Sequence, residues 1–441
     1  MAVERSVGWL EAMGVYFTRR QLIILVMGFA SGLPLLLTLS TLSFWLSKLG
    51  VDKTTIGLFA LVGIPYTFKF AWSPIIDQLP IPVLTRILGR RKSWLLVLQI
   101  GLAAAIFGMG QTDPVAAPSA TALMTILMAF FAASQDIVID AYRIELLDDR
   151  EQGAGAGTTQ VGYRIGMLLA GAGAVAMSDF ISWPTIFATL AAAMLLCAAF
   201  TLAIPEPKAG IHEVRRTTGY VEWIKGAAIR PFVDFLGRRG WIAILLFILF
   251  YKFGDAFGGT MATPFYNELG FTGTEIAAMS KIYGLIASLV GGVLGGLIVV
   301  RIGLFRTLII GGVLQAVTNL LFSYLAIKGN SLLWLGIAIT ADNLAGGVAA
   351  AAFVAYLSGL CNVAFTATQY ALLTSFMAQG RTVMSSGSGW LADHMDWVSF
   401  WALTGLMALP GLLLLLWIAR LYPQGLISRR VSETVADTSV F

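Results

Sequence analysis

The sequence predicts an all-α membrane protein with twelve transmembrane helices in two pseudo-symmetric bundles of six. Its 441 residues are 58% hydrophobic and only 12% charged, whereas soluble domains have about 25% charged residues. The mean hydropathy of +0.81 points the same way. Apolar runs long enough to cross a bilayer recur along the chain, and one long polar connection divides them into two equal sets.

Each predicted span is a mainly apolar run of the length that a helix needs to cross the hydrocarbon core, about 20 residues. In chain order the runs are 21–47, 54–79, 92–112, 119–146, 152–178, 182–204, 240–268, 272–300, 306–327, 331–358, 362–392 and 397–420. The last two are the least regular, because "SGSGWLADHMDW" at their junction is weakly apolar. The segment before the first run has no small-residue cleavage site, so we expect that run to remain as a span.

The distribution of basic residues predicts the orientation. If the N-terminus is cytoplasmic, the outside loops carry only Lys48, Lys53 and Lys328, and the inside connections carry the other loop cations. Cytoplasmic loops of membrane proteins show this excess. We therefore predict that both termini are cytoplasmic. The net charge of +5 then reflects topology, and we expect no nucleic-acid partner.

The polar connection falls after six predicted spans. It divides the chain into an N-terminal six-helix bundle (1–204), a cytoplasmic linker (205–239) and a C-terminal six-helix bundle (240–441). The halves also match each other: in one register "DFISW" aligns with "DWVSF", and Arg164 aligns with Arg381. Two parallel six-helix repeats around a central substrate site resemble the major facilitator architecture.

Several ionisable residues lie deep inside predicted spans, where a charge must face a partner or a watery cavity. They are Lys69, Asp136, Arg164, Lys252, Asp255, Asp342 and Arg381. Because Arg164 and Arg381 occupy equivalent positions, and a guanidinium binds a carboxylate bidentately, we interpret them as clamps for an anionic substrate. The alternative is structural pairing with an Asp of the same half.

The stretch "ASQDIVIDAYR" (133–143) places Asp136, Asp140 and Arg143 at i, i+4 and i+7, on one helix face. Two neighbouring carboxylates in a poorly hydrated site cannot both ionise easily. Asp136 and Asp140 are therefore candidates for proton coupling. The alternative is an internal network that ties this span to Arg143 or Arg164, and the two interpretations are compatible.

Other polar side chains complete the candidate substrate site. Lys252 and Asp255 are three residues apart and can pair, whereas Lys69 stands among aromatic residues that suit stacking on a sugar face. Lys69 could instead extend its amine toward the membrane surface. The remaining candidates for substrate binding are Tyr66, Gln135, Tyr163, Asp342, Asn343 and Gln369.

The inner connection between the second and third spans places Asp77 before Gly89, Arg90 and Arg91. It resembles the inner-gate motif of major facilitators, which implies that Asp77, Arg90 and Arg91, together with Arg143, hold an inner gate closed. The alternative is a basic loop that only sets topology.

The glycine-rich stretches "GAGAGTTQ" (153–160) and "GGVLGG" (291–296) favour close helix packing. The first lacks the Lys-Ser/Thr ending of a phosphate-binding loop. The two Cys and two His have no metal-ligand spacing. We expect no metal, no cofactor and no enzyme active site.

The chain resembles the AmpG family of muropeptide permeases of Gram-negative inner membranes. The stretches that carry the resemblance are "GFASGLPLLLT" (28–38), "KTTIGLFALVGIPYTFKFAWSPIID" (53–77), "GRRKSWLL" (89–96), "ASQDIVIDAYR" (133–143), "GAGAGTTQVGYRIGMLLAG" (153–171), "PEP" (205–207) and, more loosely, "ATQYALLTSFMAQGR" (367–381). The resemblance covers essentially the whole chain.

The resemblance implies proton-driven import of N-acetylglucosaminyl-1,6-anhydro-N-acetylmuramyl peptides, the anhydro-muropeptides, from periplasm to cytoplasm. It also implies roles in peptidoglycan recycling and β-lactamase induction, and a proton-linked function for "QDIVID". The expected partners are this substrate, protons and the lipid bilayer, and we expect a monomer. One alternative is an AmpG-like carrier of another anionic cargo such as acetyl-CoA, and another is a non-transporting membrane scaffold.

Overall fold

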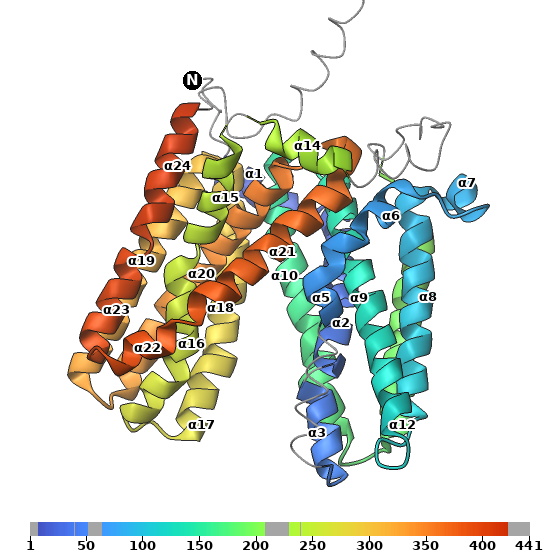
Figure 1. The fold of residues 1–441 in the computed structure, drawn as a ribbon, viewed down its shortest axis with the longest axis horizontal. Coiled ribbons are helices and arrows are strands. Elements are labelled where there is room, and N and C mark those ends of the chain that lie inside the picture. Colours follow the sequence, from blue (N-terminus) through green and yellow to red (C-terminus); the bar gives the residue numbers. More distant parts are fainter. Residues whose placement is uncertain (1–7, 39, 52–63, 208–228, 239, 422–441) are drawn as a thin grey trace, which may run out of the picture.

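The computed structural model describes residues 8–38, 40–51, 64–207, 229–238 and 240–421. Within these ranges all regular elements are helices. Figure 1 shows them in two bundles joined at the end of the molecule that carries the short helix α14 (Arg230–Leu236). The predicted span 54–79 and the predicted linker 205–239 lie partly outside the described residues.

The first bundle precedes α14 in the chain. Its helices are α1 (Trp9–Gly14), α2 (Arg19–Thr38), α3 (Ser40–Lys48), α5 (Ile64–Phe68), α6 (Ser73–Gln78), α7 (Leu84–Leu88), α8 (Arg90–Gly110), α9 (Pro118–Leu146), α10 (Gln152–Leu168), α11 (Ala174–Met177) and α12 (Trp183–Ala203). A π-helical turn, Leu169–Gly173, joins α10 to α11.

The second bundle follows α14. It contains α15 (Trp241–Phe250), α16 (Phe253–Glu268), α17 (Gly273–Ile276), α18 (Gly284–Ile302), α19 (Leu304–Lys328), α20 (Leu332–Gly359), α21 (Thr366–Ser385), α22 (Ser388–Asp393), α23 (Trp397–Leu406) and α24 (Leu409–Leu421). A π-helical segment, Ala277–Tyr283, joins α17 to α18.

In the described part of the chain, nine helical stretches are long and apolar enough to cross a membrane. They are Arg19–Lys48, Arg90–Gly110, Pro118–Leu146, Trp183–Ala203, Trp241–Glu268, Ala278–Ile302, Leu304–Lys328, Leu332–Gly359 and Trp397–Leu421. The predicted class, an all-α multi-pass membrane protein, is thereby confirmed. The other three predicted spans are helical where they are described, but they are richer in Gly, Ser and Thr, and their membrane crossing rests on the sequence pattern.

Two spans are interrupted at a lysine. Lys69 begins a 3-10 turn, Lys69–Ala71, between α5 and α6. Lys252 lies at the break between α15 and α16. Interrupted helices at membrane depth are tolerated where they border protein or a watery cavity, and they often form ion and substrate sites. Both lysines therefore lie at breaks in the helical backbone. The apolar residues around them in the sequence did not predict these breaks.

The bundles touch through glycines of α10 and α18. A Cβ added at Gly157 would lie 2.7 Å from the carbonyl oxygen of Gly292, and one at Gly296 would lie 2.8 Å from the carbonyl oxygen of Gly153. No side chain fits there, so the two backbones approach closely. This confirms that "GAGAGTTQ" and "GGVLGG" serve helix packing.

A second contact between the bundles lies at the α14 end. Helix α21 packs against α6 and α9, and its Ala367 and Ala371 join the apolar core of the first bundle. In the opposite direction, Ile144 of α9 joins the core of the second bundle. The bundles thus interlock at this end.

Candidate functional site

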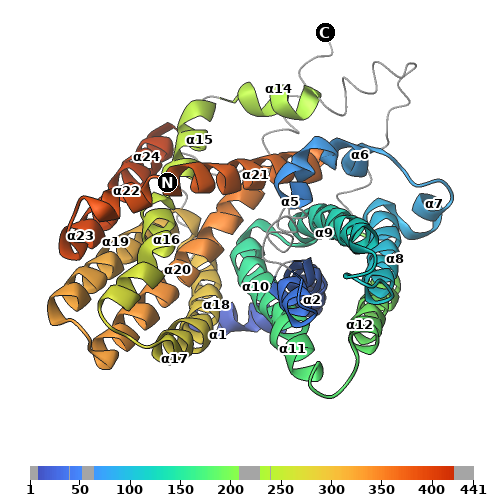
Figure 2. The same cartoon turned by 60° about the horizontal axis from the view of Figure 1, so that its bottom comes forward.

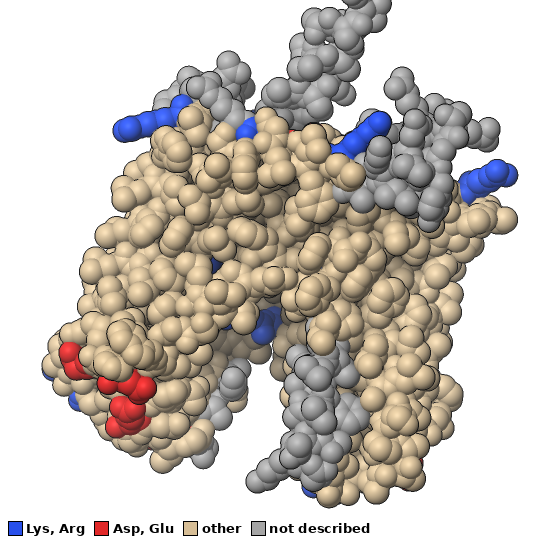
Figure 3. All heavy atoms as spheres, in the orientation of Figure 1, with Lys and Arg blue, Asp and Glu red and all other residues tan. Residues whose placement is uncertain are grey.

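A cleft separates the bundles at the end opposite to α14. Figure 3 shows it in the space-filling view, with Lys or Arg atoms visible at its roof. Figure 2 shows α21 crossing toward α5 and α6 at the closed end. The site therefore consists of an open cleft and a closed layer beneath α14.

The closed layer centres on Arg91, which is 0% exposed. Its guanidinium pairs with Asp77 at 2.8 Å and with Glu145 at 2.6 Å. Because a buried charge without a partner is costly, the two carboxylates stabilise Arg91 and are stabilised by it. Glu206 accepts hydrogen bonds from the backbone N–H groups of Arg91 and Lys92, at 2.8 and 3.0 Å, and so caps the start of α8.

This cluster also crosses to the second bundle. Asp77 Oδ2 accepts two hydrogen bonds of 3.0 Å from Thr368, one from its backbone N–H and one from its hydroxyl. Thr368 lies in the first turn of α21, where free N–H groups and the helix dipole favour an anion. We call Asp77, Arg91, Glu145 and Thr368 the gate cluster.

Arg143 forms a second contact across the bundles. It is 1% exposed, lies 3.8 Å from Asp140, and stacks over the ring of Tyr370 on α21 at 5.5 Å. Arg90, in contrast, makes no ion pair with any residue that the structure describes. Of the two arginines of the predicted motif, Arg91 therefore carries the contacts.

Helix α14 is fastened to the start of α21. Asp234 accepts hydrogen bonds from Gln369 at 2.7 Å and Asn362 at 3.0 Å, and it pairs with Arg238 at 2.8 Å. Gln369, which is 1% exposed, also donates to the Pro231 carbonyl and accepts from the backbone N–H of Asn362. Its amide is fully used, so Gln369 binds the linker helix in this conformation and does not face the cleft.

Asp234 should make the fastening of α14 sensitive to acid. Burial favours its neutral form, but hydrogen bonds from Gln369, Arg238 and Asn362 outweigh burial and lower its pKa from the ordinary 3.8. The stabilisation is therefore complete above pH 3.8 and is lost as the pH falls through the lowered value. Amide exchange of α14 should rise in that acid range. Asp234→Asn should exchange faster already at neutral pH and lose the acid response; an unchanged response in the variant would contradict the assignment.

In the first bundle, Asp136 and Asp140 are half-buried on α9. The hydroxyl of Ser31 donates to Asp136 Oδ1 at 2.5 Å. The charge of Lys69 acts on both carboxylates, and Tyr163 lies close enough to interact with Asp136. Lys69 thus lies near both acids, and Arg143 is a second cation beside Asp140. Tyr66 also lies within electrostatic reach of Asp136.

The second bundle has a comparable cluster. Lys252 Nζ lies 3.2 Å from Asp255, whose carboxylate also accepts from Gln315. Asp342 lies within electrostatic reach of both Lys252 and Asp255 and accepts a hydrogen bond from Thr318 at 3.3 Å. Here again a single lysine neighbours two carboxylates.

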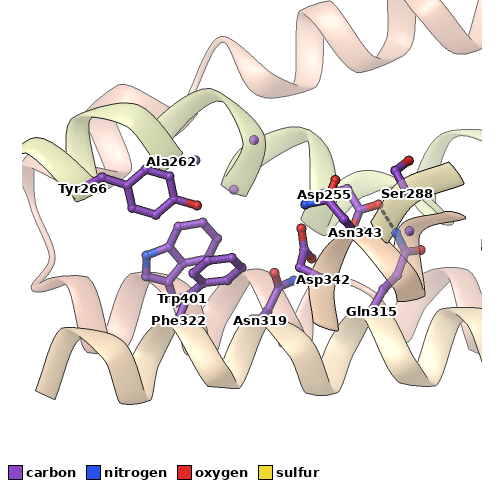
Figure 4. Close-up of a pocket in the computed structure, with 13 residues that line it drawn as sticks. Asp255, Ala262, Tyr266, Ser288, Gln315, Asn319, Phe322, Asp342, Asn343 and Trp401 are labelled. Carbon is purple, nitrogen blue, oxygen red and sulfur yellow. Dashed lines mark hydrogen bonds between the residues drawn. The ribbon is translucent and has the colours of Figure 1, made fainter. Parts of the chain in front are cut away.

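A cavity of about 150 Å³ adjoins this cluster. Figure 4 shows its two ends: Tyr266, Trp401 and Phe322 at one, and polar side chains that include Asp255, Asn343 and Asp342 at the other. The rings of Phe322 and Trp401 stack at 4.4 Å. The cavity can hold several water molecules, because one needs roughly 10–15 Å³ of such volume.

The predicted arginine clamps carry no ion pair among the described residues. Arg164 on α10 is half-buried, and within the described ranges its guanidinium contacts the sulfur of Met167 at 4.0 Å. Arg381 on α21 is exposed. The structural pairing considered as an alternative is therefore not seen in the described part. Gln135 is buried and donates to the Ala30 carbonyl at 2.9 Å, which fixes α9 against α2.

Sequence reasoning missed several residues of these clusters, namely Ser31, Glu145, Glu206, Asp234, Gln315 and Thr368. Glu145 sits near the end of a span among the acidic residues of an inner loop, where a solvated charge is the ordinary expectation. Glu145 lies five residues after Asp140, off the helix face that Asp136 and Asp140 share, so helical spacing gave no signal for it.

The arrangement belongs to a known class of membrane protein. The chain matches the Major Facilitator Superfamily over residues 22–339. The proton:xylose symporter XylE, solved with 6-bromo-6-deoxy-D-glucose, superimposes with a TM-score of 0.69 at 15% identity, over 94% of this chain and 98% of that one. The human organic anion transporter MFSD10 gives 0.62 at 15% identity, over 92% and 98%. At such identities these structures establish the fold, and the class is a membrane transporter rather than an enzyme.

Two relatives specify the family. The anhydromuropeptide permease of Escherichia coli (strain K12) is 41% identical over 399 residues, which are 90% of this chain and 79% of the relative. A Rickettsia conorii protein named as transporter AmpG 4 is 38% identical over 397 residues, 90% of this chain and 95% of the relative. The chain belongs to the AmpG family of the Major Facilitator Superfamily.

Proposed function

We propose that the protein is a proton-coupled importer of anhydro-muropeptides that works in the bacterial inner membrane. The observation that carries the proposal is the 41% identity to the Escherichia coli permease, whose name specifies this cargo. The chemistry of the cleft agrees with such a cargo, because a sugar-peptide has apolar sugar faces, amides and carboxylates. The imported product would enter peptidoglycan recycling and provide the signal for β-lactamase induction.

The charge distribution supports an orientation of the protein that suits import. Basic residues gather in the connections at the α14 end, which we assign to the cytoplasm by the positive-inside rule, together with both termini. The cleft then opens to the periplasm, and the gate cluster closes the cytoplasmic side. Import requires that Thr368 separate from Asp77 while the two bundles rock about the bound substrate. Each chain has its own cleft, so we propose that the monomer is the transporting unit.

Substrate recognition would be divided between the bundles. Arg164 and Arg381 have no ion-pair partner in the described part, so they are available to peptide carboxylates. The stacked Phe322 and Trp401 with Tyr266 offer a surface for a sugar face, and Asn343 at the polar end can bond an N-acetyl group. Lys69, Lys252, Asp255 and Asp342 would complete this surface.

Proton coupling would use the first-bundle acids. Asp136 and Asp140 lie near Lys69, and Asp140 also lies near Arg143, so a proton taken up from the periplasm would weaken the attraction between these acids and their cations. Arg143 would sense the change, because it contacts both Asp140 and Tyr370 of the other bundle. Protonation of Asp140 would thereby weaken one contact of the closed layer.

Truncation of either clamp should reduce substrate binding more than stability. Arg164→Ala or Arg381→Ala removes charge-assisted hydrogen bonds, each worth about 1.5–3 kcal/mol, so affinity should fall roughly 10- to 100-fold. Calorimetry with purified protein and a Tm measurement separate the two effects. Arg86→Gln, an exposed cation in an inner loop, serves as the control. Unchanged affinity in both variants would assign the two arginines a structural role.

The test of the function is uptake of labelled anhydro-muropeptide into proteoliposomes, with and without an inward proton gradient. We expect accumulation with the gradient, equilibration without it, and no uptake into protein-free liposomes. Uptake of acetyl-CoA in place of muropeptide would identify a different cargo. The absence of uptake of either, together with retained muropeptide binding, would point to a non-transporting scaffold.

A further inference from the structure

A second crevice lies at the α14 end, away from the central cleft. It has a volume of about 550 Å³ and is open at the surface between the start of α2, α10 and α18. Its lining residues are Tyr16, Phe17, Thr18, Arg19, Gln21, Leu22, Leu25, Thr158, Val161 and Val293. Figures 1 and 2 show α1 beside this place, and α1 packs against α18.

The crevice contains polar groups that the described protein does not satisfy. Gln21 is 1% exposed, and neither polar atom of its side-chain amide has a hydrogen-bond partner in the described part of the chain. The buried hydroxyl of Thr158 also has no hydrogen-bond partner in the described part. Buried amides and hydroxyls are almost always bonded in folded proteins, so an unsatisfied pair in one crevice indicates a missing polar ligand.

The entrance of the crevice is cationic. Arg19 is exposed and has no ion pair among the described residues, whereas its neighbour Arg20 pairs with Asp148 at 2.9 Å and Glu151 at 3.1 Å. Arg19 also begins α2, whose N-terminal end attracts negative charge. The group that enters here is therefore expected to be anionic.

The rest of the crevice is apolar and faces outward. Phe17 is 87% exposed and Leu22 is 55% exposed, and Leu25, Val161 and Val293 continue the apolar wall toward the middle of the spans. An anionic head beside Arg19, hydrogen-bonding oxygens near Gln21 and Thr158, and a chain along the apolar wall together describe an amphipathic ligand.

We propose that this crevice binds an anionic phospholipid of the leaflet at the α14 end. The phosphate would pair with Arg19, the ester oxygens would accept from Gln21 and Thr158, and an acyl chain would cover Leu22 and Val161. Basic pockets between transmembrane helices are known sites for such head groups.

The lipid would favour the conformation described above. The crevice takes walls from both bundles, and the hydroxyl of Tyr16 in the first bundle donates to the Val293 carbonyl of the second at 2.8 Å. Separation of the bundles at the α14 end would move Val293 away from α2 and divide the site. The bound lipid therefore stabilises the closed layer.

The test is lipid binding by native mass spectrometry of the full chain, delipidated and then mixed with phosphatidylglycerol or phosphatidylcholine. We expect phosphatidylglycerol to be retained preferentially. Arg19→Gln should weaken its binding about fivefold. Gln21→Leu should also weaken it, yet should not lower the Tm in lipid-free detergent, because the amide it removes is unsatisfied there. Arg86→Gln, an exposed cation at the same end, should change neither value.

Three outcomes would overturn the proposal. The first is equal retention of phosphatidylcholine and phosphatidylglycerol. The second is equal phosphatidylglycerol binding by the wild type and Arg19→Gln, a surface change that does not endanger folding. The third is binding of soluble glycerol phosphate as tight as that of the lipid, which would indicate a site for a free phosphate compound.

Discussion

Replacing Asp136 by asparagine is expected to abolish uptake driven by a proton gradient while leaving a folded, substrate-binding protein. Asparagine can still accept the hydrogen bond from Ser31 that Asp136 accepts at 2.5 Å, so local packing should persist. It cannot take up or release a proton, so the cluster with Lys69 and Asp140 loses its exchangeable charge.

The measurement compares two modes of transport in proteoliposomes. Net accumulation of labelled muropeptide should fall to the level of protein-free liposomes. Exchange of external for internal substrate, which needs no net proton movement, should continue. Asp113→Asn, at an exposed loop carboxylate that binds the backbone N–H groups of Val115 and Ala116, is the matched control. Normal accumulation by Asp136→Asn would remove Asp136 as the proton carrier.

Removing Asp77 is expected to shift the conformational equilibrium away from the closed layer. Asp77→Ala breaks the buried pair with Arg91 and both hydrogen bonds from Thr368. Loss of one partner of a buried ion pair costs about 3–5 kcal/mol, although here Glu145 still neutralises Arg91. The Tm should therefore fall, and a cysteine placed below the gate cluster should become accessible from the α14 side.

A milder change separates gating from stability. The Asp77–Arg91–Glu145 part of the cluster lies within the first bundle and can persist when the bundles separate, whereas the contact with Thr368 cannot. Thr368→Val removes one hydrogen bond to a charged group, worth about 1.5–3 kcal/mol, and should shift the equilibrium at least about tenfold with little change in Tm. Arg86→Gln tests the alternative that the basic loop only sets topology. Unchanged labelling at both faces in Asp77→Ala and Thr368→Val would favour that alternative.

Each bundle has a cluster of one lysine with two carboxylates inside its spans. The sequence predicted part of the second-bundle cluster but not the first-bundle cluster. The pairing of Lys252 with Asp255 follows from their spacing on one helix, and the structure confirms the ion pair. The association of Lys69 with Asp136 and Asp140 joins separate spans, so spacing could not predict it. The sequence showed only that each charge needed a partner or water at that depth.

Gln369 illustrates the opposite case. The sequence made it a candidate for substrate binding, yet its amide is bonded to Asp234, Pro231 and Asn362 at the linker helix. Asp234 and Pro231 come from α14, which is distant in the chain, whereas Asn362 lies in the turn just before α21. We therefore propose Gln369 as part of the closed layer rather than of the substrate site.

The sequence by itself determined the membrane class, the position of most spans, the division into two related halves and the family. Span length and backbone hydrogen bonding in the bilayer constrain each segment locally, and the family motifs are short continuous stretches. The tertiary structure decided which side chains meet: Glu145 with Arg91, Thr368 with Asp77, and Arg143 with Tyr370. These contacts join helices far apart in the chain, and their geometry depends on the packing angles and depths of whole helices, which no one-dimensional pattern of apolar residues encodes.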